Sequence, residues 1–316
     1  MNSYVRQGRS YTFYKGGIPK LMTCVMAHFH ELERETSVNV SEYITENKRL
    51  PDPDLEAAWD SIVASEEVKD RLLNQAVLAL RLRADLPFDT TSLHGLVLLY
   101  GPPGTGKTTL ARGVAQQLAP LVGGSARLIE INPHGLMSAE HGQSQQRVFE
   151  LLCEHIPMLA DDKVPTVVLL DEVESMAVAR SAASLSANPA DVHRATDAVL
   201  MALDRNARAH PHLLTVATSN FTLALDEAFR SRADVGIEMP LPDQAGALAI
   251  LQRTLADFGQ RYRKLGLLAQ DPHLMQVADE LVGLDGRRIR KVVTEALAGN
   301  RATVLDPDKL RTPDLL

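Results

Sequence analysis

The stretch that decides the fold covers residues 96–109 and reads LVLLYGPPGTGKTT. Its first part, LVLLY, is an apolar run of the kind that a buried parallel strand needs. Residues 101–108 then match the phosphate-loop pattern G-x-x-x-x-G-K-[ST] without a gap. Apolar residues at helical spacing follow from Leu110 to Leu118. Strand, glycine-rich loop and helix, in this order, form the context in which the motif binds nucleotide phosphates.

The residue types of this loop suit a bound triphosphate with Mg²⁺. Glycines allow backbone conformations that turn several N–H groups inward, and the helix that follows adds the positive end of its dipole. Lys107 is predicted to reach the β- and γ-phosphates, and the Thr108 hydroxyl to ligate Mg²⁺. The other loop residues predicted to contact the nucleotide are Pro102, Pro103, Gly104, Thr105, Gly106 and Thr109.

A second motif begins at the apolar run TVVLL, residues 166–170, which ends in Asp171 and Glu172. An acid pair at the carboxyl end of such a strand lies beside the crevice where open α/β sheets bind ligands. Asp171 is predicted to hold Mg²⁺, and Glu172 to act as general base on the attacking water. A later apolar run stops close to Asn220, whose side chain either orients that water or caps a turn.

The apolar runs predict a parallel sheet of five strands flanked by helices, with strands at 96–100, 127–131, 166–170, 213–217 and 235–238. After the Pro-Leu-Pro sequence at 240–242 the strands stop, and helices are predicted at about 243–258, 272–282 and 286–300. The predicted fold is α/β, with a short N-terminal region (1–54), an α/β subdomain (55–241) and a helical lid (242–316). Ile62 and Val63 suit either core packing or an apolar seat for an adenine ring.

Composition narrows the function classes. The net charge of −7 argues against a broad nucleic-acid surface, because phosphate binding needs concentrated Lys and Arg. The two cysteines, Cys24 and Cys153, have no metal-ligand spacing and form no disulfide framework. No apolar run is long enough for a membrane span, and no signal-peptide pattern opens the chain. We therefore expect a cytoplasmic protein without a membrane partner.

Together these motifs resemble the AAA+ ATPases: GPPGTGKT, then LLDE, then TSN, then Arg232, then Gly286-Arg287 in the helical part. Four segments resemble more narrowly the pachytene checkpoint ATPases, which remodel HORMA-domain proteins. They are WDSIV at 59–63, LIEINPHGLMS at 128–138, LLDEVESM at 169–176 and AFRSRAD at 228–234. The short N-terminal region suggests a bacterial relative, of the kind found beside cGAS-like nucleotidyltransferases in anti-phage operons.

The resemblance implies ATP as the nucleotide and a homohexamer as the assembly. It makes Lys107 and Thr108 the Walker A residues, Asp171 and Glu172 the Walker B residues, Asn220 sensor 1 and Arg287 sensor 2. Arg232 becomes the arginine finger that reaches a neighbouring subunit's nucleotide, and Arg230 a candidate second finger. From the residues alone, Arg232 has an alternative role in a salt bridge with Asp234 or Glu238.

The sequence departs from the family in its first pore loop. The matching residues 136–142 (LMSAEHG) contain no aromatic ring, so Met137 or His141 would have to grip a threaded chain. The second pore loop is expected at about 178–190. We expect a remodeller that acts on a HORMA-domain protein, alone or bound to a cGAS-like nucleotidyltransferase, and that switches anti-phage signalling off. The alternatives are a nucleotide-gated scaffold that threads nothing, and a nucleic-acid motor or loader, against which the acidic charge counts.

Overall fold

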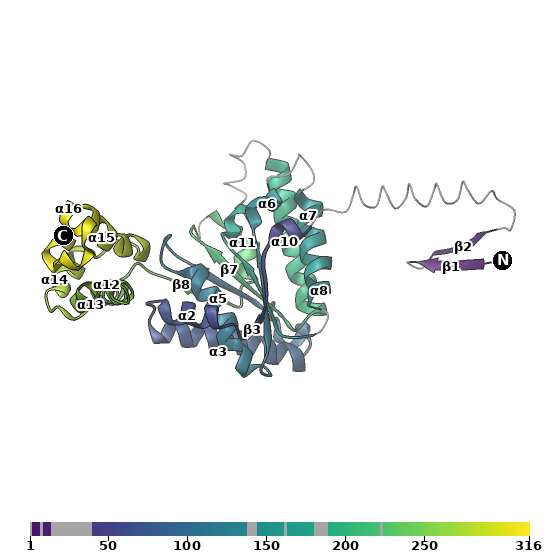
Figure 1. Ribbon diagram of the computed structural model, residues 1–316. Helices are drawn as coiled ribbons and strands as arrows, with labels where there is room; N and C mark the ends of the chain where they lie inside the picture. The colour runs from purple at the N-terminus through teal and green to yellow at the C-terminus, as the bar shows by residue number, and fades with distance from the viewer. Residues whose placement is uncertain are drawn as a thin grey trace. The chain divides into compact units, whose positions relative to one another are not determined.

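The computed structural model describes residues 2–6, 9–13, 40–137, 144–160, 163–179, 189–221 and 224–316. The chain divides into two compact units, Met1–Val40 and Ser41–Leu316. In the first unit, strands β1 (Asn2–Arg6) and β2 (Arg9–Phe13) pair antiparallel. All predicted site residues, from Ile62 to Arg287, belong to the second unit, whose helices and strands are labelled in Figure 1.

The second unit is built on a six-stranded sheet with the strand order β3-β5-β6-β7-β4-β8. Five strands run parallel, and they confirm the five apolar runs found in the sequence: β4 (Leu96–Tyr100), β5 (Ala126–Ile131), β6 (Thr166–Leu170), β7 (Leu213–Ser219) and β8 (Val235–Glu238). The sixth, β3 (Ile44–Leu50), pairs antiparallel with β5 at one edge. β3 was not predicted from the sequence because ITENKRL is mostly polar. An edge strand with one solvent-exposed face can have such a composition.

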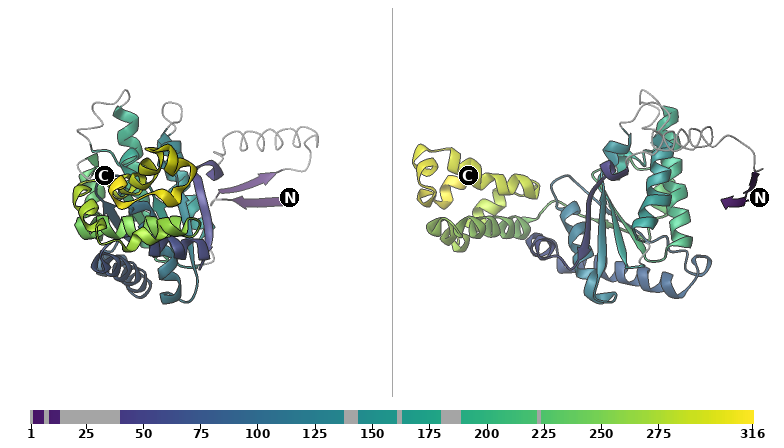
Figure 2. Two further views of the ribbon diagram at one scale, coloured as in Figure 1. Left: turned by 60° about the vertical axis from the view of Figure 1, so that its left-hand side comes forward. Right: turned by 45° about the vertical axis from the view of Figure 1, so that its right-hand side comes forward.

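Helices lie on both sides of this sheet (Figures 1 and 2). On one side are α2 (Pro53–Ser61), α3 (Glu66–Asp85) and α5 (Lys107–Leu118). On the other are α7 (Ser144–Glu150), the π-helical turn Leu151–His155, α8 (Ile156–Leu159) and α10 (Pro189–Ala209). Shorter elements are α4 (Phe88–Thr91), α6 (Pro133–Met137) and α11 (Glu227–Ser231), with 3₁₀ turns at Val40–Tyr43, Ala119–Leu121 and η4 (Val173–Ser175).

The phosphate-loop helix α5 is fixed by its apolar face. Leu110, Val114 and Leu118 are fully buried in the core that this helix shares with α2, α3 and the sheet. Gly113 brings α2 close, because a Cβ atom there would lie 2.7 Å from Cε3 of Trp59. The burial of this face sets the position of Lys107 and Thr108 at the start of the helix.

The C-terminal residues from Gln244 on form a helical bundle with its own core, and we refer to this bundle as the lid. Its helices are α12 (Gln244–Gly259), α13 (Arg263–Leu267), α14 (Leu274–Glu280), α15 (Gly286–Ala298) and α16 (Arg301–Leu305), with 3₁₀ turns at Leu268–Gln270, Pro307–Lys309 and Thr312–Leu315. Leu251, Leu255 and Ile289 are fully buried in that core. The three helices predicted from the sequence correspond to α12, α14 and α15, whereas the short α13 and α16 gave no separate signal.

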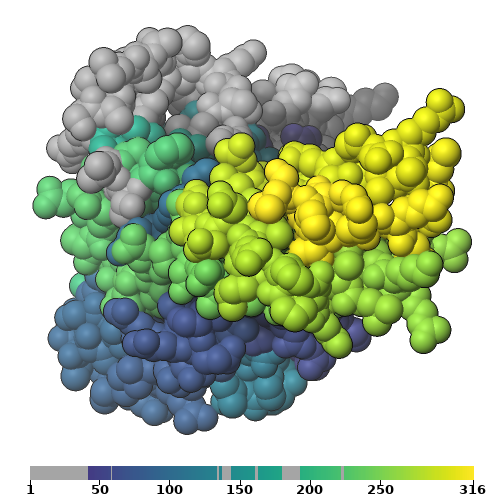
Figure 3. Space-filling model, turned by 90° about the vertical axis from the view of Figure 1, so that its left-hand side faces the viewer, coloured from purple at the N-terminus to yellow at the C-terminus, as the bar shows by residue number. Residues whose placement is uncertain are grey.

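The lid, green to yellow in Figure 3, faces the viewer there and contacts the α/β part at the end of α2. Arg253 on α12 donates a 2.8 Å hydrogen bond to the carbonyl of Asp60 at the end of α2. Val63, just beyond α2, packs against the lid core.

No helix among the described residues is long and apolar enough to cross a membrane.

Candidate nucleotide-binding and active site

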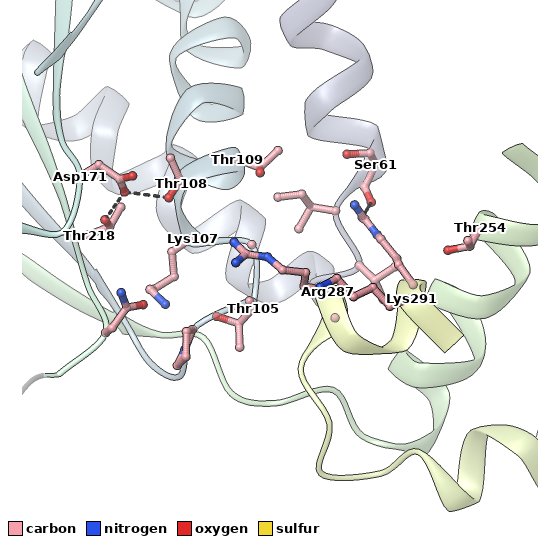
Figure 4. A pocket seen from close by; sticks show the side chains of 18 of the residues that line it. Ser61, Thr105, Lys107, Thr108, Thr109, Asp171, Thr218, Thr254, Arg287 and Lys291 are labelled. Carbon is pink, nitrogen blue, oxygen red and sulfur yellow. Dashed lines mark hydrogen bonds between the residues drawn. The ribbon is translucent and has the colours of Figure 1, made fainter. Parts of the chain in front are cut away.

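A cavity of about 640 Å³ lies between the phosphate loop, the ends of β6 and β7, and lid helices α12 and α15. Almost all the predicted site residues line it: Ile62, Val63, Pro103, Gly104, Thr105, Gly106, Lys107, Thr108, Thr109, Asp171, Glu172, Asn220 and Arg287. Figure 4 shows Arg287 and Lys291 on the lid side and Lys107, Thr108 and Asp171 on the sheet side. Pro102, Arg230 and Arg232 do not line it.

The phosphate loop has the backbone that its glycines allow. Gly104 and Gly106 have φ angles of +76° and +92°, in the left-handed region that side-chain-bearing residues avoid. The Gly106 carbonyl accepts the first hydrogen bond of α5, from Leu110 N–H at 2.8 Å. The loop therefore leads directly into the positive end of a helix, where an anion is stabilised.

Lys107 is buried, and its Nζ donates to the carbonyls of Gly101 and Pro102 at 2.9 and 2.7 Å. Burial lowers the pKa of Lys107, and the nearby carboxylates, Glu174 first among them, oppose that shift. The ammonium group is thus held inside the loop, where phosphate oxygens can replace the two carbonyls. Thr105 Oγ1 also donates to the Pro102 carbonyl, at 3.0 Å, so Pro102 shapes the loop through its backbone.

Thr108 and Asp171 meet at the end of β6. Thr108 Oγ1 donates to Asp171 Oδ1 at 2.7 Å (Figure 4). A hydroxyl and a carboxylate beside a phosphate loop fit Mg²⁺, which prefers oxygen ligands and binds through one or two protein groups plus phosphates and water. Among the described residues there is no cluster of three or more His, Cys, Asp or Glu that could hold a metal ion by itself.

Glu172 and Asn220 face each other across the ends of β6 and β7. Asn220 Nδ2 donates to Glu172 Oε1 at 3.1 Å. Both residues line the cavity. A carboxylate and an amide at this place have the chemistry to accept a proton from a water and to orient it.

Arg232 is held outside the cavity by an ion pair within its own chain. Its Nε and Nη2 donate to Asp204 Oδ1 and Oδ2 at 2.7 and 2.8 Å, and Nη1 donates to the Ala228 carbonyl at 2.9 Å. The Asp204 carboxylate thereby raises the pKa of Arg232. The sequence analysis correctly left a salt bridge open but named the wrong partners. Asp234 instead accepts the N–H groups of residues 94–96.

The lid approaches the phosphate loop closely at Gly104. A Cβ atom on Gly104 would lie 2.1 Å from Asp285 Oδ1. Asp285 also caps α15, because the same oxygen accepts the N–H groups of Arg287 and Arg288 at 2.9 and 3.0 Å. This contact places Arg287, in the first turn of α15, beside the loop.

Ile62 and Val63 retain both of the roles that the sequence left open. Ile62 is buried, and a Cβ atom on Gly106 would lie 3.3 Å from its Cδ1. Val63 packs against the lid core, and both residues line the cavity. Their side chains thus pack and at the same time offer an apolar wall.

Comparison with known proteins places this arrangement in a family. The family model described as "ATPase family associated with various cellular activities (AAA)" matches residues 97–241. The chain is 46% identical over 268 residues to CD-NTase-associated protein 6 of Pseudomonas aeruginosa. The aligned residues cover 84% of this chain and 88% of that protein. The chain belongs to the AAA ATPase family. The resemblance stated from the motifs is therefore confirmed.

Other relatives of this AAA ATPase are longer. It is 32% identical over 282 residues to the Pachytene checkpoint protein 2 homolog of Danio rerio, across 81% of this chain and 66% of that protein. It spans 54% of the homolog from Gallus gallus, at 36% identity over 74% of this chain. The chain thus spans between about half and two thirds of these two homologs.

Two solved structures share the fold of this AAA ATPase. C. elegans PCH-2 superposes with a TM-score of 0.67 at 24% identity, over 85% of this chain and 72% of that one. A chain from the E. coli MS115-1 HORMA:CdnC:Trip13 complex superposes with a TM-score of 0.66 at 19% identity, over 88% of this chain and 95% of that one.

The site of this AAA ATPase contains residues that the sequence analysis missed. From the lid come Thr254, Phe258, Arg290, Lys291 and Thr294. The last three lie on one face of α15 with Arg287, because they follow it by three, four and seven residues. This helical spacing could have been recognised in the sequence. The fold also adds Thr218, in the cavity wall, and Glu174, whose Oε1 accepts the N–H of Asn220 at 3.1 Å.

Most of each expected pore loop lies outside the described residues. The first expectation concerned residues 136–142, of which 138–142 are not described, including His141. The second concerned 178–190, of which 180–188 are not described. The roles suggested for Met137 and His141 stay predictions.

Proposed function

We propose that this AAA ATPase hydrolyses ATP with Mg²⁺ and uses the cycle to remodel a HORMA-domain protein. One observation carries the proposal: a single cavity gathers Lys107, the Thr108–Asp171 pair and the Glu172–Asn220 pair. A protein that only binds a nucleotide as a scaffold does not need the Glu172–Asn220 pair, because a carboxylate and an amide in this position serve to activate water.

The proposed roles follow from the contacts. Lys107 binds the β- and γ-phosphates once they replace the carbonyls of Gly101 and Pro102. Thr108 and Asp171 would hold Mg²⁺, which neutralises phosphate charge when bound. Glu172 takes the proton of the attacking water, Asn220 orients that water, and Arg287 adds positive charge from the lid.

The partner is proposed from the relatives. CD-NTase-associated protein 6 is 46% identical, and the structural neighbour comes from a complex of HORMA, CdnC and Trip13. We propose that this chain also acts on a HORMA-domain protein bound to a cGAS-like nucleotidyltransferase, separating the two and switching anti-phage signalling off. Pulling on the HORMA protein through a central pore would supply the force.

A ring is part of this proposal. Arg232 would have to leave Asp204 to reach a neighbour's γ-phosphate, and Arg230, exposed on α11, is a second candidate. We propose a homohexamer, in which each arginine finger completes the site of the adjacent subunit and couples hydrolysis to assembly.

The experiment is a pull-down from the native host with the Glu172→Gln protein held in ATP. This variant is expected to keep ATP and its substrate bound. The matched control is Lys107→Ala, which lacks the phosphate contact and should recover no partner. Recovery of a HORMA-domain protein by Glu172→Gln alone supports the remodeller. Recovery of only the protein itself, with an empty ring, favours the nucleotide-gated scaffold, for which the missing pore aromatic in 136–142 also argues.

A further inference from the structure

The turn that follows β6 has an unusual backbone. Glu172 has φ and ψ of +52° and +51°, the left-handed region that residues with a Cβ atom avoid. The surrounding structure must therefore hold this conformation. Ser175 contributes, since its N–H and Oγ donate to the Glu172 carbonyl at 3.1 and 3.0 Å. The conformation matters because Glu172 is the proposed general base.

The sheet itself does not fix where Glu172 lies relative to Asn220. The parallel register between β6 and β7 ends with Leu170 opposite Ala217. Asp171 and Glu172 come after that register, and Asn220 follows the end of β7. In the described residues, the alignment of the two strand tips therefore depends on bonds that involve side chains.

Thr218 makes two of these bonds. It is 1% exposed, its Oγ1 accepts the Glu172 N–H at 3.0 Å, and the same hydroxyl donates to Asp171 Oδ1 at 2.5 Å (Figure 4). A hydroxyl has one donor and two acceptor positions, so one side chain serves both acids at once. Thr218 thus ties β7 to the left-handed residue and to the Mg²⁺ ligand beside it.

Glu174 makes a further bond between the two strand tips. It lies on η4, and its Oε1 accepts the Asn220 N–H at 3.1 Å. Its other oxygen, Oε2, is buried and has no hydrogen-bond partner among the described residues. A carboxylate held in this way is costly to bury, which argues for a role beyond filling space. It also ties the backbone of Asn220 to the turn that carries Glu172.

We propose that Thr218 and Glu174 are positioning residues for ATP hydrolysis: they align Glu172 with Asn220 through hydrogen bonds between the two strand tips. This inference rests on the proposed function, because it assumes that Glu172 and Asn220 act on the attacking water. Thr218 sets the conformation of the base, and Glu174 sets the position of the amide that meets it.

The first test compares Thr218→Val with Thr218→Ser in the full chain. Valine keeps the shape but loses both hydrogen bonds, whereas serine keeps the hydroxyl. We expect Thr218→Val to lower kcat by roughly 10- to 100-fold with KM for ATP changed by less than about threefold, and Thr218→Ser to stay within about threefold of the parent. A parent-like kcat in Thr218→Val, or equal losses in both variants, would overturn the role of Thr218.

The second test concerns Glu174 and needs no change at Thr218, so it decides the role of Glu174 even where Thr218→Val does not fold. Glu174→Ala should lower kcat about tenfold, while Glu174→Gln, which keeps an acceptor oxygen for Asn220 N–H, should lose less. In an Asn220→Ala background, Glu174→Ala should cost nothing more, because its effect runs through that amide. A full additional loss in that background would contradict the inference.

Failure of the inference and failure of the proposed function give different results. A parent chain that binds ATP but never hydrolyses it, with or without a HORMA-domain protein, removes the proposed function. A parent chain that hydrolyses ATP, with unchanged rates in Thr218→Val and Glu174→Ala, removes only the positioning roles. Melting temperatures of all variants, measured alongside, separate loss of positioning from loss of folding.

Discussion

The nucleotide cavity and the surroundings of Arg232 differ in how much of a catalytic site one chain assembles. In the cavity, Lys107, Glu172 and Asn220 meet within a single subunit. Arg232, proposed to act on the same reaction, lies outside that cavity and is paired with Asp204 by two short hydrogen bonds. Groups that act within one subunit are thus placed by the fold of that subunit. Arg232, which we propose to act across a subunit interface, is instead paired with a carboxylate of its own chain.

The largest expected effect is the loss of ATP affinity when Lys107, in the phosphate loop, is replaced. Lys107→Ala removes the buried ammonium group that we assign to two phosphates. Because each charge-assisted hydrogen bond contributes roughly 1.5–3 kcal/mol, ATP affinity should fall by about 100-fold or more. Titration with a fluorescent ATP analogue measures this directly. An affinity equal to that of the parent would show that the loop does not bind phosphate as proposed.

The next effect separates binding from chemistry. Glu172→Gln should keep ATP affinity near the parent value and lower turnover by roughly 10²- to 10⁴-fold, because the amide cannot accept the water's proton. Phosphate release under saturating ATP is the measurement. If the variant hydrolyses ATP at the parent rate, the general base lies elsewhere.

Arg232 should behave differently from both residues. Rings of Arg232→Ala alone and of Glu172→Gln alone should each be nearly inactive, since a missing finger costs about 10³- to 10⁵-fold. Mixed rings should regain activity, because a Glu172→Gln subunit supplies an intact Arg232 to a neighbour with an intact Glu172. Inactivity at every mixing ratio would instead assign Arg232 a folding role through its Asp204 pair.

A smaller effect is expected where the lid meets the loop. Gly104→Ala puts a methyl group 2.1 Å from Asp285 Oδ1 and should weaken ATP binding about tenfold by displacing the first turn of α15. Gly124→Ala is the matched control, because Gly124 also has a positive φ of +88° but nothing within 4 Å of its added methyl group. Equal losses of ATP affinity in the two variants would contradict a specific lid contact.

The smallest effect near neutral pH concerns the charge on Lys107. Burial lowers its pKa, so the ammonium group loses its proton at a lower pH than an ordinary lysine does. As the pH rises, ATP affinity should therefore begin to fall before the pH reaches 10.5, the ordinary pKa of lysine. Between the lowered pKa and 10.5 the folded chain binds fewer protons than the unfolded chain, so this group's contribution to the free energy of unfolding rises with pH. Titrations from neutral to alkaline pH test this, with Lys107→Arg as a control that keeps its charge. A parent chain as insensitive to pH as that control would contradict it.

Sequence reasoning succeeded where one physical rule acted locally. Buried parallel strands read as apolar runs, and the phosphate loop reads directly from its glycines, so five strands and most of the cavity were predictable. The edge strand β3 has no such run. The partner of Arg232 could not be read, because Asp204 lies 28 residues away on another element and only packing brings it close.

The positioning residues were hidden for a related reason. Thr218 has an ordinary place at the end of an apolar run, and Glu174 follows an acid pair that already explained the motif. Their contacts with Glu172 and Asn220 depend on how two strand tips meet in space. Such roles follow from geometry and leave no pattern in a single sequence.

The most direct test of the central claim uses a purified complex of a HORMA-domain protein and a cGAS-like nucleotidyltransferase from the same host, labelled so that separation changes fluorescence energy transfer. We expect the parent chain to separate the two with ATP, and we expect no separation with ADP, with Lys107→Ala or with Glu172→Gln. Continued ATP hydrolysis by the parent chain while the complex stays intact would contradict it.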